Sequence, residues 1–272
     1  MRRIGTALSH AALMSGALVF IAPFIWMVLT SLTPSSAFLD LTRLVPSLSA
    51  GLDHYRRALT DVPLLRFMAN GVFVCGAILI LQLLVCIPSA YALAQLRFPG
   101  RTALLVCVLA ALAIPEQVPA IPLYIGFAKA RLLDTYGALI LPFIGSAFGI
   151  FLFRQFFRSV PGEMLQAARL DGCGELSIVW RILLPQAWPA VGAFAIISLV
   201  AHWNDLYWPL IVIVTPELAT PPLGVMFFRS AELPDAEFGA LLAGGTMITA
   251  PLLIAFLFAR RLFMRGIGLA GP

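Results

Sequence analysis

Long uncharged apolar segments constrain this chain more than any other feature of its sequence. Five runs without a charged residue cover residues 4–39, 67–96, 135–153, 182–204 and 238–259, and a sixth, 102–128, is interrupted only by Glu116. A helix that crosses a bilayer needs about 20 consecutive, mostly apolar residues. The chain is 61% hydrophobic and 11% charged, whereas a soluble domain is about half apolar and a quarter charged. The sequence therefore predicts an all-α membrane protein with six transmembrane helices.

The predicted helices form a single domain, 1–272, and leave one long polar connection, 161–185, between the fourth and the fifth. The first apolar run follows Arg2 and Arg3, as in a signal peptide, but it is longer than the usual apolar region of about 7–15 residues. We therefore expect it to be retained as the first helix. The predicted transmembrane helices cover residues 8–32, 67–93, 102–125, 136–157, 188–213 and 240–260.

The distribution of charge predicts the orientation. With six helices, both termini lie on the same side of the membrane. Placing them in the cytoplasm puts eleven of the eighteen basic residues and only three of the thirteen acidic residues on that side. Cytoplasmic loops carry an excess of Lys and Arg. We therefore predict that both termini and the 161–185 loop are cytoplasmic.

The sequence contains no motif for catalysis, metal binding or nucleic-acid binding. A phosphate-binding P-loop requires G-x-x-x-x-G-K-[ST], but the single lysine, Lys129, is followed by alanine and lacks those glycines. The three histidines are scattered, and the four cysteines form no C-x-x-C pair. The basic residues are dispersed, so the net charge of +5 does not indicate nucleic acid. Any ATP hydrolysis that drives this protein is expected in a separate chain.

A proline-rich segment interrupts the third predicted helix. Three prolines fall within residues 115–122, next to Glu116 and Gln117, and they are incompatible with a regular helix. Irregular backbone at membrane depth is tolerated where it lines a cavity or is covered by protein, and a charge there is costly unless it faces a cavity or a partner. We predict that residues 114–124 form part of a transport pathway, with Glu116, Gln117 and Tyr124 as candidate contacts.

A second candidate group of pathway residues lies toward the end of the fifth predicted helix. Trp203, Asn204, Asp205 and Trp208 combine aromatic faces with hydrogen-bonding groups, which suits the binding of sugar rings and hydroxyls. The same residue types also fit a membrane-interface belt of aromatic side chains whose polar neighbours bond to adjacent helices. The sequence leaves both interpretations open.

The 161–185 loop is a polar island between two very apolar regions. Ala167 and Ala168 offer a helical surface without bulky side chains, against which another protein can pack. Asp171 and Gly172 form a turn in which glycine tolerates a positive φ.

The predicted structure of this loop is two short helices joined by that turn and lying along the membrane. The second helix is expected to end at Leu184, because Pro185 follows. A simple amphipathic connector and a docking surface for a partner both fit this pattern. The residues predicted to hold the loop against the protein are Met164, Leu165 and Leu170.

The loop resembles the cytoplasmic "EAA" loop of binding-protein-dependent ABC importer permeases. That pattern is E-A-A, three residues, Gly, nine residues, then I-x-L-P. Gln166 stands at the position of the glutamate, while the matching residues are Ala167, Ala168, Gly172, Ile182, Leu184 and Pro185. Other segments resemble the maltose-type, carbohydrate-importing branch of the family, namely residues 91–101, 121–124, 134–142 and 203–209.

This resemblance implies a multi-pass subunit of the bacterial cytoplasmic membrane, surrounded by lipid, that is not itself an enzyme. In that family two six-helix permeases pair, two ATPase subunits bind ATP and Mg²⁺, and an extracytoplasmic solute-binding protein delivers the sugar. The 161–185 loop would be the coupling loop, containing the helix that docks into an ATPase. The residues implied in coupling are Gln166, Ala167, Ala168, Asp171, Gly172, Ile182, Leu184 and Pro185.

Three alternatives differ from this interpretation in the cargo, in the energy source or in the class of protein. A glycerol-phosphate or polyol importer would need cationic groups in the pathway, and the predicted helices contain none away from their ends. An autonomous ion-coupled carrier requires ionisable groups at mid-membrane, for which Glu116 is the one candidate. A membrane-embedded enzyme would need a nucleophile, base or metal-ligand pattern that the sequence lacks. We expect a mono-, di- or oligosaccharide to be the cargo.

Overall fold

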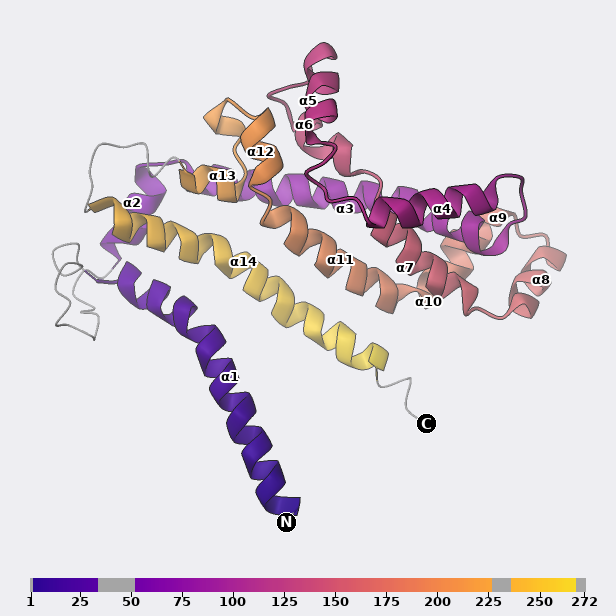
Figure 1. The fold of residues 1–272 in the computed structure, drawn as a ribbon, viewed down its shortest axis with the longest axis horizontal. Helices are drawn as coiled ribbons and strands as arrows, with labels where there is room; N and C mark the ends of the chain where they lie inside the picture. Colours follow the sequence, from indigo (N-terminus) through magenta and orange to yellow (C-terminus); the bar gives the residue numbers. More distant parts are fainter. Residues whose placement is uncertain (1, 34–51, 227–235, 268–272) are drawn as a thin grey trace. The chain divides into compact units, whose positions relative to one another are not determined.

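Figure 1 shows the computed structural model of the chain, which describes residues 2–33, 52–226 and 236–267. Within these ranges every regular element is a helix. An all-helical fold is expected for a chain of this composition, because a helix satisfies its backbone hydrogen bonds internally and can therefore cross an apolar bilayer. The predicted all-α fold class is confirmed.

The chain divides into two compact units, Met1–Arg66 with Gly224–Pro251, and Phe67–Leu223 with Leu252–Pro272. In the first unit, the His54 ring packs against Gly239, where an added Cβ would lie 2.4 Å from the ring. His54 Nε2 also lies 3.0 Å from the carbonyl oxygen of Thr33. The helices of this unit are α1 (Arg2–Ser31), α2 (Asp53–Thr60) and the first part of α14 (Ala236–Ile267). The single domain 1–272 stays a prediction.

The second unit holds most of the remaining elements. From the N-terminal side they are α3 (Leu64–Gln95), α4 (Arg101–Leu112), α5 (Ala120–Lys129), α6 (Tyr136–Ile140), the 3₁₀ turn η3 (Leu141–Phe143) and α7 (Ala147–Arg158). After the polar loop come α11 (Trp188–Trp203), α12 (Tyr207–Val212), the 3₁₀ turn η5 (Pro216–Leu218) and α13 (Pro221–Met226).

Two helical segments among the described residues are long and apolar enough to cross a membrane alone, Ala12–Ser31 and Leu64–Gln95. Two pairs of helices raise this number to four if each bent pair is one span. These pairs are Tyr136–Phe143 with Ala147–Arg158, bent by 40°, and Glu175–Gln186 with Trp188–Trp203, bent by 82°. The count of six and the orientation with both termini inside stay predictions.

The third predicted transmembrane segment is broken, as its prolines indicate. Helix α4 ends at Leu112 and α5 begins at Ala120, so Pro115 and Pro119 lie in the connection between them. Pro122 is inside α5, but only in its first turn, where a missing amide N–H costs no intrahelical bond. The predicted irregular backbone is confirmed for residues 113–119.

The ring of Phe194 on α11 packs directly against Gly149 of α7. An added Cβ on Gly149 would lie 2.7 Å from the ring of Phe194. Small residues at membrane helix interfaces let helices approach in this way. The Asp134 carboxylate ties the start of α6 to the end of α12, accepting from the Val214 and Thr215 amides at 2.9 Å each and from the Thr215 hydroxyl. These bonds, led by the Thr215 hydroxyl, lower the pKa of Asp134.

Candidate functional site

The loop predicted to couple this chain to an ATPase, residues 161–185 and called the coupling loop below, folds into two arms joined by a tight turn. The first arm is α8 (Gly162–Leu170), and it ends in a Schellman motif. The Cys173 amide donates to the Ala168 carbonyl and the Gly172 amide to the Arg169 carbonyl, both at 3.0 Å. Gly172 has a φ of +82°, which glycine adopts without steric strain. The predicted turn at Gly172 is confirmed.

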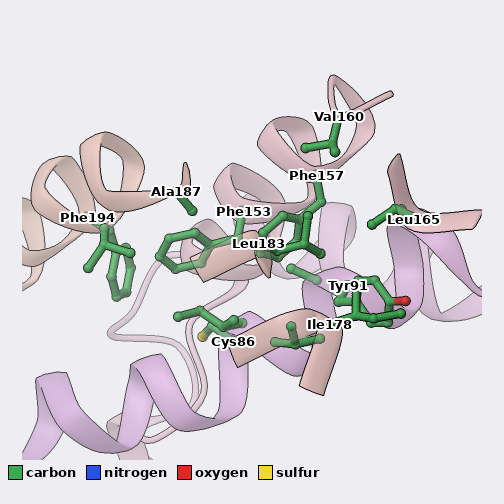
Figure 2. Packing of buried hydrophobic residues seen from close by; sticks show 14 of the residues in the cluster. Cys86, Tyr91, Phe153, Phe157, Val160, Leu165, Ile178, Leu183, Ala187 and Phe194 are labelled. Atoms are coloured by element: carbon green, nitrogen blue, oxygen red, sulfur yellow. The ribbon is translucent and has the colours of Figure 1, made fainter. Parts of the chain in front are cut away.

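One face of α8 packs against the protein. Leu165 is 1% exposed and Ala168 is 7% exposed, and both belong to a core cluster with side chains from α3, α7 and α11. Figure 2 shows Leu165 in the same cluster of side chains as Tyr91, Phe157 and Ile178. Residues three and four apart share one face of a helix, so Met164, Leu165 and Ala168 all face this cluster.

The observed burial of the α8 side chains corrects two expectations. Leu170 is 90% exposed, so it does not hold the loop, whereas Met164 and Leu165 do. Ala168 is buried in its own subunit and is therefore not part of an exposed alanine surface with Ala167. The coupling-loop candidates that are exposed are Gln166, Ala167, Asp171, Gly172 and Pro185, and the half-buried ones are Ile182 and Leu184.

The second arm continues past the proline that was expected to end it. It consists of α9 (Glu175–Ser177), a π-helical stretch η4 (Ile178–Leu183) and α10 (Leu184–Gln186). In a regular α-helix the ring of Pro185 would collide with the carbonyl of Arg181, but a π-helix is wider and bonds residues five apart. The arm therefore passes through Pro185, and the chain turns at Ala187 by 82° into α11.

Three side chains join the two arms of the loop to helix α3. Arg169 Nε donates to Glu175 Oε1 at 2.9 Å, and an Arg169 terminal nitrogen donates to Glu175 Oε2 and to the Tyr91 hydroxyl, both at 3.2 Å. The Tyr91 hydroxyl also donates to Glu175 Oε2. We refer to Tyr91, Arg169 and Glu175 as the clamp.

The electrostatics of the clamp follow from these bonds. The Arg169 guanidinium, followed by the Tyr91 hydroxyl, lowers the pKa of Glu175, and the Glu175 carboxylate in turn raises the pKa of Arg169. Both groups are therefore charged around neutral pH. The sequence analysis missed the clamp. The oppositely charged pair flanking the turn was a signal that could have found two of its members, whereas Tyr91 is 78 residues from Arg169.

A cavity of about 710 Å³ lies in the second unit. Four of the predicted pathway residues line it, Glu116, Gln117, Asp205 and Trp208. Its aromatic wall contains Phe143, Phe148, Phe194, Tyr207 and Trp208. The proline-rich connection between α4 and α5 therefore borders a hollow, and its role in a transport pathway stays a prediction.

Three predicted pathway residues do not line this cavity. Trp203 is 5% exposed and packs near Gly71, where an added Cβ would lie 3.2 Å from its ring. The Asn204 side-chain amide donates to the Val200 carbonyl at 2.8 Å, and Tyr124 is exposed. For Trp203 and Asn204, packing and helix bonding explain the residue type.

A buried polar network at the cavity wall escaped the sequence analysis. Gln82 of α3 accepts from the Ser198 hydroxyl at 2.6 Å and donates to the Phe143 carbonyl at 2.9 Å. Gln82 Nε2 also lies 3.3 Å from His202 Nε2. Phe143 is the last residue before the break between η3 and α7, so Gln82 bonds the backbone where the helix is interrupted. All four residues line the cavity.

The charged side chains of the cavity are both acidic. Glu116 and Asp205 line it, whereas no Lys or Arg occurs among the described residues of its wall. Asp205 Oδ1 also accepts from the Trp208 amide at 3.2 Å, and the Trp208 ring nitrogen donates to the Ala138 carbonyl at 2.8 Å. The indole and the carboxylate are thus held in place. Acidic acceptors beside aromatic faces suit a hydroxyl-rich neutral solute better than an anion.

The sequence matches the family described as "Binding-protein-dependent transport system inner membrane component" over residues 85–268. It is also similar to curated proteins along almost its whole length. One is the arabinooligosaccharides transport system permease protein AraQ of Halalkalibacterium halodurans, 32% identical over 258 residues, which cover 94% of this chain and 92% of that protein.

Two further relatives bear names with different cargoes. The diacetylchitobiose uptake system permease protein NgcG of Streptomyces coelicolor is 30% identical, covering 94% of this chain and 85% of that protein. The sn-glycerol-3-phosphate transport system permease protein UgpE of Yersinia pestis is 30% identical, covering 95% and 94%.

Among solved structures, a chain of a bacterial ABC transporter involved in the import of the acidic polysaccharide alginate has the same fold. The two chains superpose with a TM-score of 0.83 at 24% identity, over 96% of this chain and 97% of the other. At this identity the likeness shows the fold alone.

Proposed function

Because this chain belongs to the family of binding-protein-dependent transport system inner membrane components, we propose that it is the permease subunit of an ATP-driven importer that moves a sugar into the cell. The observation that carries this proposal is the family match, which spans both the coupling loop and most of the cavity wall. One unit of the protein thus combines a surface loop suited to a partner with a hollow suited to a solute.

The proposed topology has six transmembrane helices with both termini and the coupling loop in the cytoplasm. The positive-inside distribution of arginine supports it. The proposed location is the bacterial cytoplasmic membrane, and membership of a family of inner membrane components supports it. In this orientation the exposed face of α8 points toward a cytoplasmic partner.

The proposed partners are a second six-helix permease, two ATPase subunits and an extracytoplasmic solute-binding protein. ATP and Mg²⁺ are bound by the ATPases. Closure of the ATPase dimer moves the coupling loops and turns the paired permeases between inward-facing and outward-facing states. Rotation of rigid bodies about an interface is a known class of switch. Ligands shift such an equilibrium only through different affinities for the two states.

The proposed cargo is a neutral mono-, di- or oligosaccharide. Two relatives carry oligosaccharide names, while a third is named for glycerol 3-phosphate, so a polyol phosphate is the alternative. Glu116 and Asp205 in the cavity wall favour the neutral sugar, because carboxylates repel a phosphate. The aromatic side chains of the wall offer faces on which a sugar ring stacks.

Isolation of the tagged chain from native membranes under mild solubilisation tests this function. We expect a second permease and an ATPase to co-purify, and the isolated assembly to hydrolyse ATP. The sugar is then identified from the binding protein that associates with it. Recovery of the chain alone, together with uptake driven by an ion gradient in liposomes, would contradict the importer and favour an autonomous carrier.

A further inference from the structure

The clamp joins three elements that are distant in sequence. Tyr91 comes from α3, Arg169 from α8 and Glu175 from α9, and the carboxylate is held in a two-point contact by the guanidinium. The Tyr91 hydroxyl closes the triangle by bonding to both charged partners. Side-chain hydrogen bonds of the clamp therefore connect both arms of the coupling loop to helix α3.

The geometry of the clamp distinguishes it from an ordinary surface ion pair. The Arg169 and Glu175 side chains are 39% and 45% exposed, and isolated pairs with such exposure contribute little. Here, however, the pair is bidentate and anchored by Tyr91, which is only 3% exposed and packs edge-on against Phe157. Bidentate arginine–carboxylate contacts fix direction as well as distance.

The apolar contacts of α8 have a different mechanical effect. Leu165 and Ala168 bury their side chains in the core cluster, which keeps α8 close to the protein. Hydrophobic contact is non-directional, so by itself it permits α8 to rotate or slide on that surface. The clamp removes this freedom, because rotation of α8 pulls the Arg169 guanidinium out of the plane of the Glu175 carboxylate.

We propose that the clamp makes the coupling loop and α3 move as one body, so that Arg169, Glu175 and Tyr91 are positioning residues for ATP-driven transport. This inference rests on the proposed importer function. Without the clamp, a force applied to α8 by an ATPase is dissipated by movement of α8 around the Gly172 turn. ATP is then hydrolysed with little change at the cavity.

The test measures how strongly ATP changes access to the cavity, with no need to know the solute. In the complete transporter isolated with its partner subunits, the four native cysteines of this chain are replaced by serine or alanine. One cysteine is then introduced by Ala201→Cys, a position that lines the cavity. The probe is a membrane-impermeant sulfonated maleimide, and its rate of reaction with this chain is compared with and without Mg-ATP. ATP hydrolysis and ATPase co-purification are measured on the same samples.

In the background with an intact clamp, we expect Mg-ATP to change the labelling rate by at least about fivefold, the lower end of typical couplings between sites. In Arg169→Gln, Glu175→Gln and Tyr91→Phe, we expect less than about a twofold change while the ATPase stays bound and active. The charge swap of Arg169→Glu with Glu175→Arg should restore most of the change. Arg97→Gln, which removes an exposed arginine outside the clamp, should leave it intact.

The outcomes separate the clamp from the importer function. No effect of Mg-ATP in the background with an intact clamp would overturn the importer and the clamp together. If Mg-ATP changes the labelling rate normally in the background with an intact clamp, and equally in Arg169→Gln and Tyr91→Phe, the clamp proposal alone would be overturned. The clamp would also be overturned if the ATPase no longer co-purified with Arg169→Gln while Mg-ATP still changed the labelling rate normally in Tyr91→Phe. Arg169 would then be a docking residue.

Discussion

The coupling loop and the cavity belong to the same unit but are built in opposite ways. Where the coupling loop packs on the protein, its residues Leu165 and Leu183 and Phe157 of α7 are essentially excluded from solvent and form one cluster. Around the cavity, a space of about 710 Å³ is bordered by acidic, amide and aromatic side chains. Packed interiors transmit displacement, whereas a mostly apolar hollow with a few polar groups can accommodate a small ligand. In the proposed importer, force transmission therefore belongs to the packed region and solute contact to the cavity.

Phe194 belongs to both regions. Its side chain is part of the core cluster and also lines the cavity, and it fills the space that Gly149 leaves on α7. A shift in the packing beneath the loop therefore reaches the cavity wall through direct contact. The two regions differ in character but share this ring.

Removal of a packed side chain of the coupling loop should have the largest effect on stability. We expect Leu165→Ala to lower the free energy of unfolding by about 2–5 kcal/mol, because it leaves a void in a close-packed cluster. Equilibrium unfolding in mixed micelles measures the change. Leu170→Ala is the matched control and should change stability by no more than about 0.5 kcal/mol, since Leu170 is exposed. Equal losses in the two variants would contradict the assignment of faces on α8.

A smaller effect is expected at the turn between the arms, where no packing is involved. Gly172→Val should cost about 1–3 kcal/mol, because valine is strained at a positive φ although the site has open space. Gly174→Val tests the same side chain in equally open space at a φ of −70°. The same unfolding assay should therefore show little change for Gly174→Val. If both substitutions were neutral, the turn would not depend on its left-handed residue.

The smallest effect on stability is expected in the cavity. Glu116→Gln should change the free energy of unfolding by about 0.5 kcal/mol or less, because Glu116 borders a hollow. It should nevertheless raise the KM for the sugar about fivefold, since a hydrogen bond to a charged acceptor is stronger than one to an amide. The KM is measured by uptake into proteoliposomes. A large loss of stability with an unchanged KM would reverse the roles of the two regions.

The sequence predicted the coupling loop well where local rules apply. The Asp171–Gly172 pair indicated the turn, and the structure gives Gly172 a positive φ. The family resemblance inferred from this loop is confirmed by the match over residues 85–268. Which side of α8 is buried was harder to predict. Ala167 and Ala168 are chemically identical, and only tertiary packing decides which one is buried.

Long-range contacts account for most of what the sequence did not reveal. Glu116 could be predicted to face a cavity from the sequence, because a charge in an apolar segment is costly unless it faces a cavity or a partner. Gln82 and Ser198 are single polar residues in apolar helices, and nothing local shows that they bond across 116 positions of sequence. Trp203 was chosen for its aromatic ring, yet in the structure that ring is buried near Gly71 and outside the cavity wall.

The 82° turn at Ala187 sets the second arm of the coupling loop and helix α11 almost at right angles to each other. Residues 175–186 form the shorter arm, and the 16-residue helix α11 forms the longer one, of about 24 Å at about 1.5 Å per residue. The corner is stiff, because Ala187 is fully buried and its amide donates to the Leu183 and Leu184 carbonyls. In the proposed importer, a displacement of the short arm would therefore be passed to α11 in a nearly perpendicular direction. The far end of α11 carries His202, which lines the cavity together with Asp205, so the proposed movement would arrive at the cavity wall.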